Sequence, residues 1–154
     1  MKIKLRKLII DQLDRRFSSL KNLHDLSTPA KGWVYSIRTA LKMSLRQLGS
    51  RLGISAQSVK EMEQREANGS ITLKSLREVA NALEMKVVYA IIPKDDNIEK
   101  MIEKRATEIA REIVLRTSNT MMLEDQENSK ERIEKAIKNK AEEIKNKMPN
   151  YLWD

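Results

Sequence analysis

The chain has 154 residues and a net charge of +8, and its 40% of hydrophobic residues suffices for a modest core. No cysteine is present, which excludes disulfides and thiolate zinc sites, and the single histidine, His24, cannot by itself form a metal site or a nucleophile–base pair. Abundant Lys, Glu, Leu, Ile and Met beside only 4 Gly and 3 Pro predict a mainly all-α chain.

The positive charge is concentrated in the first two thirds of the chain. Residues 1 to 30 carry 7 Lys and Arg against 3 Asp and Glu, residues 31 to 93 carry 10 against 5, and residues 94 to 154 carry 13 against 14. Such a field attracts a polyanion through counterion release. The apolar run near the start is too short for a signal peptide or a membrane span, so we expect a cytoplasmic protein with no membrane partner.

The first two segments of the chain are predicted to be helical. Residues 1 to 30 place apolar side chains at three- and four-residue spacings from Ile3 to Leu23, which predicts an amphipathic helix that ends before Pro29. Residues 31 to 84 contain short apolar-periodic stretches that follow Ser or Thr and are separated by glycine. This punctuation predicts a domain of short helices joined by tight turns.

The last two segments differ in character. Residues 85 to 93 are β-branched and aromatic and close with proline, which predicts one short strand. A lone strand would leave its backbone groups unpaired, so we expect it to pair with the same segment of a second copy through Val87, Val88, Tyr89, Ala90 and Ile91. Residues 94 to 154 form a C-terminal extension of amphipathic helices, interrupted between Ser118 and Ser129.

The most informative stretch is LRQLGSRLGISAQSVKEMEQ, residues 45 to 64. It predicts a helix-turn-helix, because Ser44 and Gln47 have capping-box spacing, Gly49 permits close approach of the second helix, and Gly53 suits a left-handed turn. Ser55 then caps the second helix. The apolar side chains expected to lock the two helices together are Leu48, Leu52, Ile54, Val59 and Met62.

Residues 33 to 84 resemble the Cro/C1-type (Xre) helix-turn-helix family of phage repressors, with ISAQSVKEMEQ similar to its recognition-helix segment. The longer stretch GWVYSIRTALKMSLRQLGSRLGIS, with REANGSITLKSL and VVYAIIP, resembles the subfamily called mobile mystery protein A. The resemblance implies a five-helix DNA-binding domain, a homodimer that represses its own operon from an inverted repeat, and a neighbouring Fic-domain protein as a candidate partner. It implies no cofactor.

A recognition helix that starts at Ser55 projects its polar side chains away from the face defined by Val59 and Met62. Gln57 suits a bidentate contact to adenine, and Ala56 suits a thymine methyl. Lys60 suits guanine or phosphate, and Glu61 suits cytosine. The predicted base contacts are therefore Ala56, Gln57, Lys60 and Glu61. The alternative is that Gln57 and Glu61 are ordinary solvated side chains.

Phosphate contacts are expected from the helix starts and from nearby cations. The predicted set is Arg38, Ser44, Arg46, Gln47, Arg51, Ser55, Ser58, Gln64, Arg65 and Lys74. Each of the cations has the alternative reading of an ordinary surface charge.

The sequence gives less support to two other classes of protein. An enzyme is disfavoured, since the chain has no Gly-rich phosphate loop, no HExxH motif and no residue set around His24 for nucleophilic catalysis. The remaining alternative is an antitoxin or adaptor that holds a Fic-domain protein through its C-terminal helices. Fic proteins are commonly restrained by a [ST]-x-x-x-E-[GN] pattern, and residues 120 to 125 approach it through Glu124 but end in Asp125. That departure disfavours direct inhibition.

Overall fold

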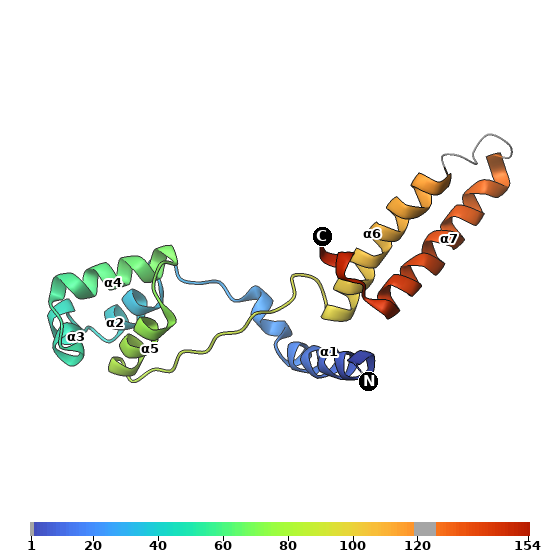
Figure 1. Ribbon diagram of the computed structural model, residues 1–154. Coiled ribbons are helices and arrows are strands. Elements are labelled where there is room, and N and C mark those ends of the chain that lie inside the picture. The colour runs from blue at the N-terminus through green and yellow to red at the C-terminus, as the bar shows by residue number, and fades with distance from the viewer. Residues whose placement is uncertain (1, 119–125) are drawn as a thin grey trace. The chain divides into compact units, whose positions relative to one another are not determined.

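The computed structural model describes residues 2–118 and 126–154. Across these residues the chain forms seven α-helices, two short 3-10 helices and no strand (Figure 1). The prediction of a mainly helical chain is confirmed. The chain divides into a central unit, Asp25–Ile91, and a terminal unit, which combines Met1–His24 with Ile92–Asp154. None of the described helices has an apolar run long enough to cross a membrane.

The central unit contains α2 (Trp33–Ala40), α3 (Leu45–Leu52), α4 (Ala56–Asn68) and α5 (Leu73–Ala82). These four α-helices are one fewer than the five implied by the resemblance. The chain leaves α5 through Glu84, whose φ of 58° is left-handed, and enters residues 86–92, which are rich in β-branched side chains. Such residues favour extended backbone over a further helical turn.

One apolar cluster holds the central unit together. Helices α3 and α4 pack against each other, while α2 packs on α4 and α5 packs on α3. Leu48, Val59 and Val79 are completely buried, one from each of α3, α4 and α5. The buried members of the cluster are Val34, Leu48, Val59, Met62, Val79 and Leu83.

Residues 85–93 have no regular secondary structure within the single described chain. Val88 and Ile91 are 77% and 87% exposed, and Tyr89 is 60% exposed with the Arg77 guanidinium 5.5 Å from the centre of its ring. The predicted strand is therefore not formed here. Because its partner was expected in a second copy, the pairing stays a prediction.

The terminal unit is built from α1 (Lys2–Ser19), η1 (Lys21–Asp25), α6 (Ile98–Ser118), α7 (Gln126–Lys147) and η2 (Asn150–Trp153). Helices α6 and α7 form a hairpin, and η2 returns to α6 (Figure 1). Their apolar residues are buried against one another, and the cluster comprises Ile102, Ala106, Ile109, Ala110, Ile137, Ile144 and Leu152. The C-terminal helices thus cover much of their own apolar surface.

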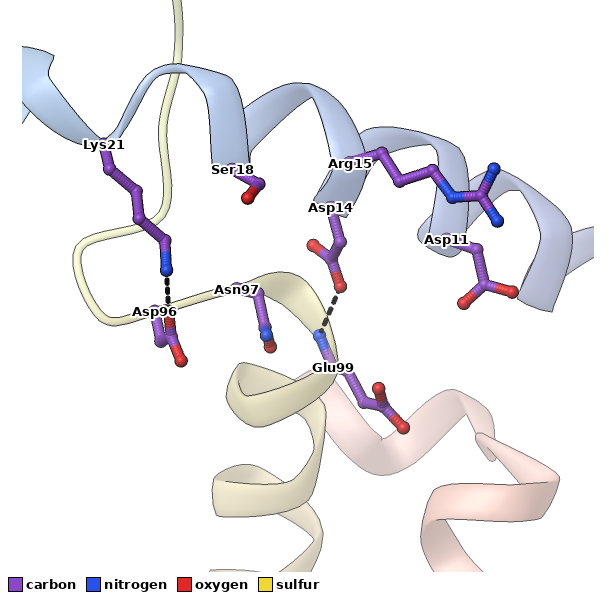
Figure 2. A pocket seen from close by; sticks show the side chains of 8 residues that line it. All are labelled: Asp11, Asp14, Arg15, Ser18, Lys21, Asp96, Asn97 and Glu99. Atoms are coloured by element: carbon purple, nitrogen blue, oxygen red, sulfur yellow. Dashed lines mark hydrogen bonds and ion pairs between the residues drawn. The ribbon is translucent and has the colours of Figure 1, made fainter.

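Helix α1 joins the terminal unit through contacts with α6. The Asp14 carboxylate accepts hydrogen bonds from the backbone N–H groups of Ile98, at 2.8 Å, and Glu99, at 3.3 Å, so a residue of α1 caps the first turn of α6 (Figure 2). The Lys21 ammonium lies 3.6 Å from the Asp96 carboxylate beside this cap. Ile10 packs on the apolar cluster of the unit.

Candidate nucleic-acid interface

The start of α3 has the geometry that its sequence predicts. The Ser44 hydroxyl accepts a hydrogen bond from the backbone N–H of Gln47 at 3.1 Å. In return, the Gln47 amide oxygen accepts one from the backbone N–H of Ser44 at 2.8 Å. The predicted capping box is confirmed, and it sets the residue at which α3 begins.

The turn between α3 and α4 also matches the prediction. Gly53 ends α3 in the left-handed region, with φ 70° and ψ 28°, and Ser55 starts α4 by accepting the backbone N–H of Ser58 at 3.1 Å. A Cβ added to Gly49 would lie 2.6 Å from the Ile54 carbonyl oxygen, closer than real contacts allow. Gly49 is therefore the point at which the turn approaches α3.

Four of the five apolar residues predicted to lock these helices do so. Leu48, Val59 and Met62 are buried in the core cluster, and Leu52 packs against it. Ile54 is 36% exposed and lies in the turn, so it contributes less than the other four. The locked pair fixes which face of α4 is left for solvent.

That outer face of α4 carries the four predicted base-contacting residues. Gln57, Lys60 and Glu61 are exposed, and Ala56 is half-buried at the first position of the helix. The Gln57 amide nitrogen donates a hydrogen bond to the Glu61 carboxylate at 3.3 Å. Gln57 has a second amide hydrogen and an oxygen that this bond does not use.

The predicted phosphate-contacting hydroxyl and amide groups lie at two helix starts. Ser44 and Gln47 lie at the start of α3, and Ser55 and Ser58 lie at the start of α4, where the two hydroxyl oxygens are 2.9 Å apart. Helix starts present free backbone N–H groups and a partial positive charge. The side chains of Ser44, Gln47 and Ser55 act as caps, and the Gln47 amide nitrogen takes no part in the capping box.

Arg38 has a different role from the one predicted. Its Nε and Nη2 donate to the two carboxylate oxygens of Glu63, and its Nη1 donates to the Met43 carbonyl at 2.8 Å. The side chains of Arg38 and Glu63 are only 11% and 7% exposed. The hydrogen bonds with Glu63 raise the pKa of the Arg38 guanidinium above its ordinary value. This buried pair ties α2 to α4, so the predicted phosphate contact is not available to Arg38.

The other predicted phosphate-contacting residues lie on the surface. Arg51 is exposed, and its Nη1 donates to the Ala82 carbonyl at 3.0 Å, which links α3 to the end of α5. Within the described part of the chain, the remaining residues are exposed and form no ion pair, namely Arg46, Gln64, Arg65 and Lys74. They are free to meet an anion.

Glu66 is a structural residue that the sequence analysis missed. Its two carboxylate oxygens accept hydrogen bonds from the backbone N–H groups of Trp33, at 3.0 Å, and Val34, at 3.3 Å. Gly32 precedes them with φ 84°, and a Cβ there would lie 1.9 Å from the Glu66 carboxylate. The sequence does contain a signal for this role. Glu63 and Glu66 stand at the three- and four-residue spacings that continue the buried positions of Val59 and Met62 along α4.

The five predicted dimerisation residues form one continuous segment without regular secondary structure. Val87 is half-buried, and Val88, Tyr89, Ala90 and Ile91 are exposed in the single chain. Glu124 lies outside the described residues. In the described part of the chain, no group of acidic or histidine side chains has an arrangement that could hold a metal ion.

No family model, no curated protein and no solved structure matches the chain.

Proposed function

We propose that the chain is a sequence-specific DNA-binding regulator of transcription that acts as a homodimer on an inverted repeat, as an autorepressor of its own operon. The observation that carries this proposal is the locked pair of α3 and α4. This pair leaves Gln57, Lys60 and Glu61 exposed on one face of α4. The turn before α4 begins at Gly53 and packs closely against Gly49 of α3. A helix presented in this way fits the major groove of B-form DNA.

The Cro/C1-type assignment belongs to this proposal, as does the division of labour among the residues. Gln57 reads adenine with its amide, Lys60 reaches guanine or phosphate, Glu61 accepts from cytosine, and Ala56 meets a thymine methyl. The exposed cations Arg46, Arg51, Arg65 and Lys74 contact phosphates, together with the side chain of Gln64 and the polar side chains at the two helix starts, namely Ser44, Gln47, Ser55 and Ser58. The excess of five positive charges over residues 31 to 93 supports a polyanionic partner.

Dimerisation through residues 86–92 completes the proposal. The segment is mostly apolar, and its side chains at Val88, Tyr89 and Ile91 are exposed, so an antiparallel ribbon with a second copy would pair its backbone groups. A two-fold dimer places two copies of α4 on half-sites about 34 Å apart along DNA.

The alternative of an adaptor that holds a Fic-domain protein through α6 and α7 receives less support. The buried cluster of the terminal unit already covers much of the apolar surface of these two helices.

The test is selection of binding sites from a random DNA library, followed by footprinting on the DNA upstream of the gene. We expect an inverted repeat bound at nanomolar concentration, with random DNA bound at least about a thousandfold more weakly. Asn139→Ala, on the exposed surface of α7, serves as the control variant and should bind like the parent protein. Equal affinity for selected and random DNA would overturn the proposal.

A further inference from the structure

Helix α1 presents an apolar face that no described residue of the terminal unit covers. Leu5, Leu8 and Ile9 are 59%, 52% and 48% exposed, although each is a large aliphatic side chain. They share one side of the helix, since they stand three and four residues apart. Ile10 and Asp14, which join α1 to the rest of the unit, project from the opposite side.

The rim of this apolar face is positively charged. Lys2, Lys4, Arg15 and Arg16 flank it, and none of them forms an ion pair with any described residue. The two carboxylates of α1, Asp11 and Asp14, line a pocket on the side that meets α6, and Arg15 also lines this pocket at the edge of the outer face (Figure 2). The outer face of α1, defined here as Leu5, Leu8 and Ile9 with these four cations, is therefore apolar at its centre and cationic at its edge.

We propose that the outer face of α1 docks an acidic amphipathic segment of another protein, in which apolar side chains are flanked by Asp or Glu. Apolar side chains of the partner would cover Leu5, Leu8 and Ile9, and its carboxylates would meet the four cations at the rim. Helix-to-helix recognition of this kind uses apolar anchors at three- and four-residue spacing, with charge complementarity setting the choice of partner.

Charge disfavours a second copy as the occupant. A two-fold dimer brings a surface against itself, so the face of one α1 would meet the same face of the other. Antiparallel pairing then places Lys2 and Lys4 of one copy beside the cations of residues 15 and 16 in the other. Like charges in direct opposition destabilise such a contact.

The length of the apolar stripe disfavours a lipid surface. A helix that lies on a membrane has an apolar face along its whole length. Here the stripe spans little more than one turn, because Gln12 and Arg16, which stand seven residues after Leu5 and Ile9 respectively, continue the same line of the helix with polar side chains. A local set of apolar anchors from a protein segment fits this short stripe.

The probe is a fluorescent helical peptide of about 20 residues with a leucine stripe flanked by Glu, and the control peptide has Lys in place of every Glu. Fluorescence anisotropy with the full-length protein measures both. We expect the Glu peptide to bind at least about tenfold more tightly than the Lys peptide, with a difference that shrinks as salt is added.

Two variants of α1 test the site from the side of the protein. Leu8→Gln and Arg16→Glu should each weaken binding of the Glu peptide about tenfold. Ile113→Gln on α6 and Lys138→Glu on α7 make matched changes at exposed positions elsewhere and should leave the affinity unchanged. Circular dichroism checks that every variant is folded.

Three results would overturn the proposal. The first is equal affinity for the Glu and Lys peptides, or an effect of the α6 and α7 variants as large as that of the α1 variants. The second is that the parent protein sediments with phosphatidylglycerol vesicles whereas the Leu8→Gln variant does not, which assigns the face to lipid. The third is a dimer that Leu8→Gln converts to a monomer in the ultracentrifuge, which assigns the face to a second copy.

Discussion

The guanidinium of Arg38 and the carboxylate of Glu63 form a bidentate ion pair that is almost completely shielded from solvent, and it joins α2 to α4. The orientation of α4 in the central unit therefore depends on a polar contact in addition to the apolar cluster. Pairs of this kind are sensitive to the loss of one member, because the other is then a buried charge without a partner.

Glu63→Ala should lower the free energy of unfolding by about 3 kcal/mol, because it leaves Arg38 buried and uncompensated. Urea denaturation followed by circular dichroism measures the change. Glu78→Ala, at an exposed position of α5, is the control and should change the free energy of unfolding by less than about 0.5 kcal/mol. Similar losses for the two variants would contradict a structural role for the pair.

Gly49→Ala should destabilise the central unit by about 2 kcal/mol, because the new methyl group would collide with the Ile54 carbonyl. Gly53→Ala has open space around its Cβ but must keep a φ of 70°, which costs about 1 kcal/mol. The midpoint of thermal unfolding should therefore fall further for Gly49→Ala. The reverse order would mean that the approach of the turn to α3 is not the tighter constraint.

If α4 reads bases, Gln57→Ala and Arg51→Ala should differ in kind. Gln57→Ala should relax the preference at one base position in each half-site, at a cost of about 1–3 kcal/mol on the preferred sequence. Arg51→Ala should weaken binding to all sequences and reduce the salt dependence by about one phosphate contact. Titrations on selected and random DNA at several salt concentrations separate the two effects. An equal loss on both DNAs for Gln57→Ala would remove it from base recognition.

Val88→Pro should disrupt the proposed ribbon between two copies, because proline has no N–H to donate and cannot occupy an interior ladder position. Sedimentation velocity should show conversion of the dimer to a monomer. Val88→Thr keeps the N–H group and the β-branched shape, and it should remain dimeric. A dimeric, folded Val88→Pro protein would place the dimer interface elsewhere.

The stability of the terminal unit should fall at acidic pH partly through Asp96. The hydrogen bond from Lys100, followed by the charges of Lys100 and Lys21, lowers the pKa of Asp96 below its ordinary value. Its contribution to stability is therefore complete above the unfolded pKa of about 4 and is lost as the pH falls through the lower folded value. The difference in melting temperature between the parent and Asp96→Asn should be present at pH 6 and shrink as the pH is lowered below about 4. A difference that persists unchanged at the lower pH would rule out this linkage.

Local features of the central unit could be predicted from the sequence, because each depends on residues only a few positions apart. The capping box of Ser44 and Gln47, the left-handed Gly53 and the tight approach at Gly49 are all of this kind. The exposed position of Gln57 follows from the same helical periodicity.

Contacts between distant residues could not be predicted in the same way. Arg38 was expected on the surface because arginine usually lies there, and only the packing of α2 on α4 brings it to Glu63, 25 residues away. Glu66 reaches the start of α2 across 33 residues. The missing fifth helix reflects a local competition, in which the β-branched residues after α5 favour extended backbone.

The cap that Asp14 places on α6 makes the terminal unit a discontinuous domain, with the central unit inserted between its two parts. The two residues in its first hydrogen bond are 84 positions apart, so α1 leaves the ribosome long before the helix that it caps. The central unit is encoded in one stretch and can fold as soon as it has been synthesised. Its folding replaces most of the long flexible loop that would otherwise separate Asp14 from Ile98, and so lowers the entropic cost of bringing the two ends of the terminal unit together.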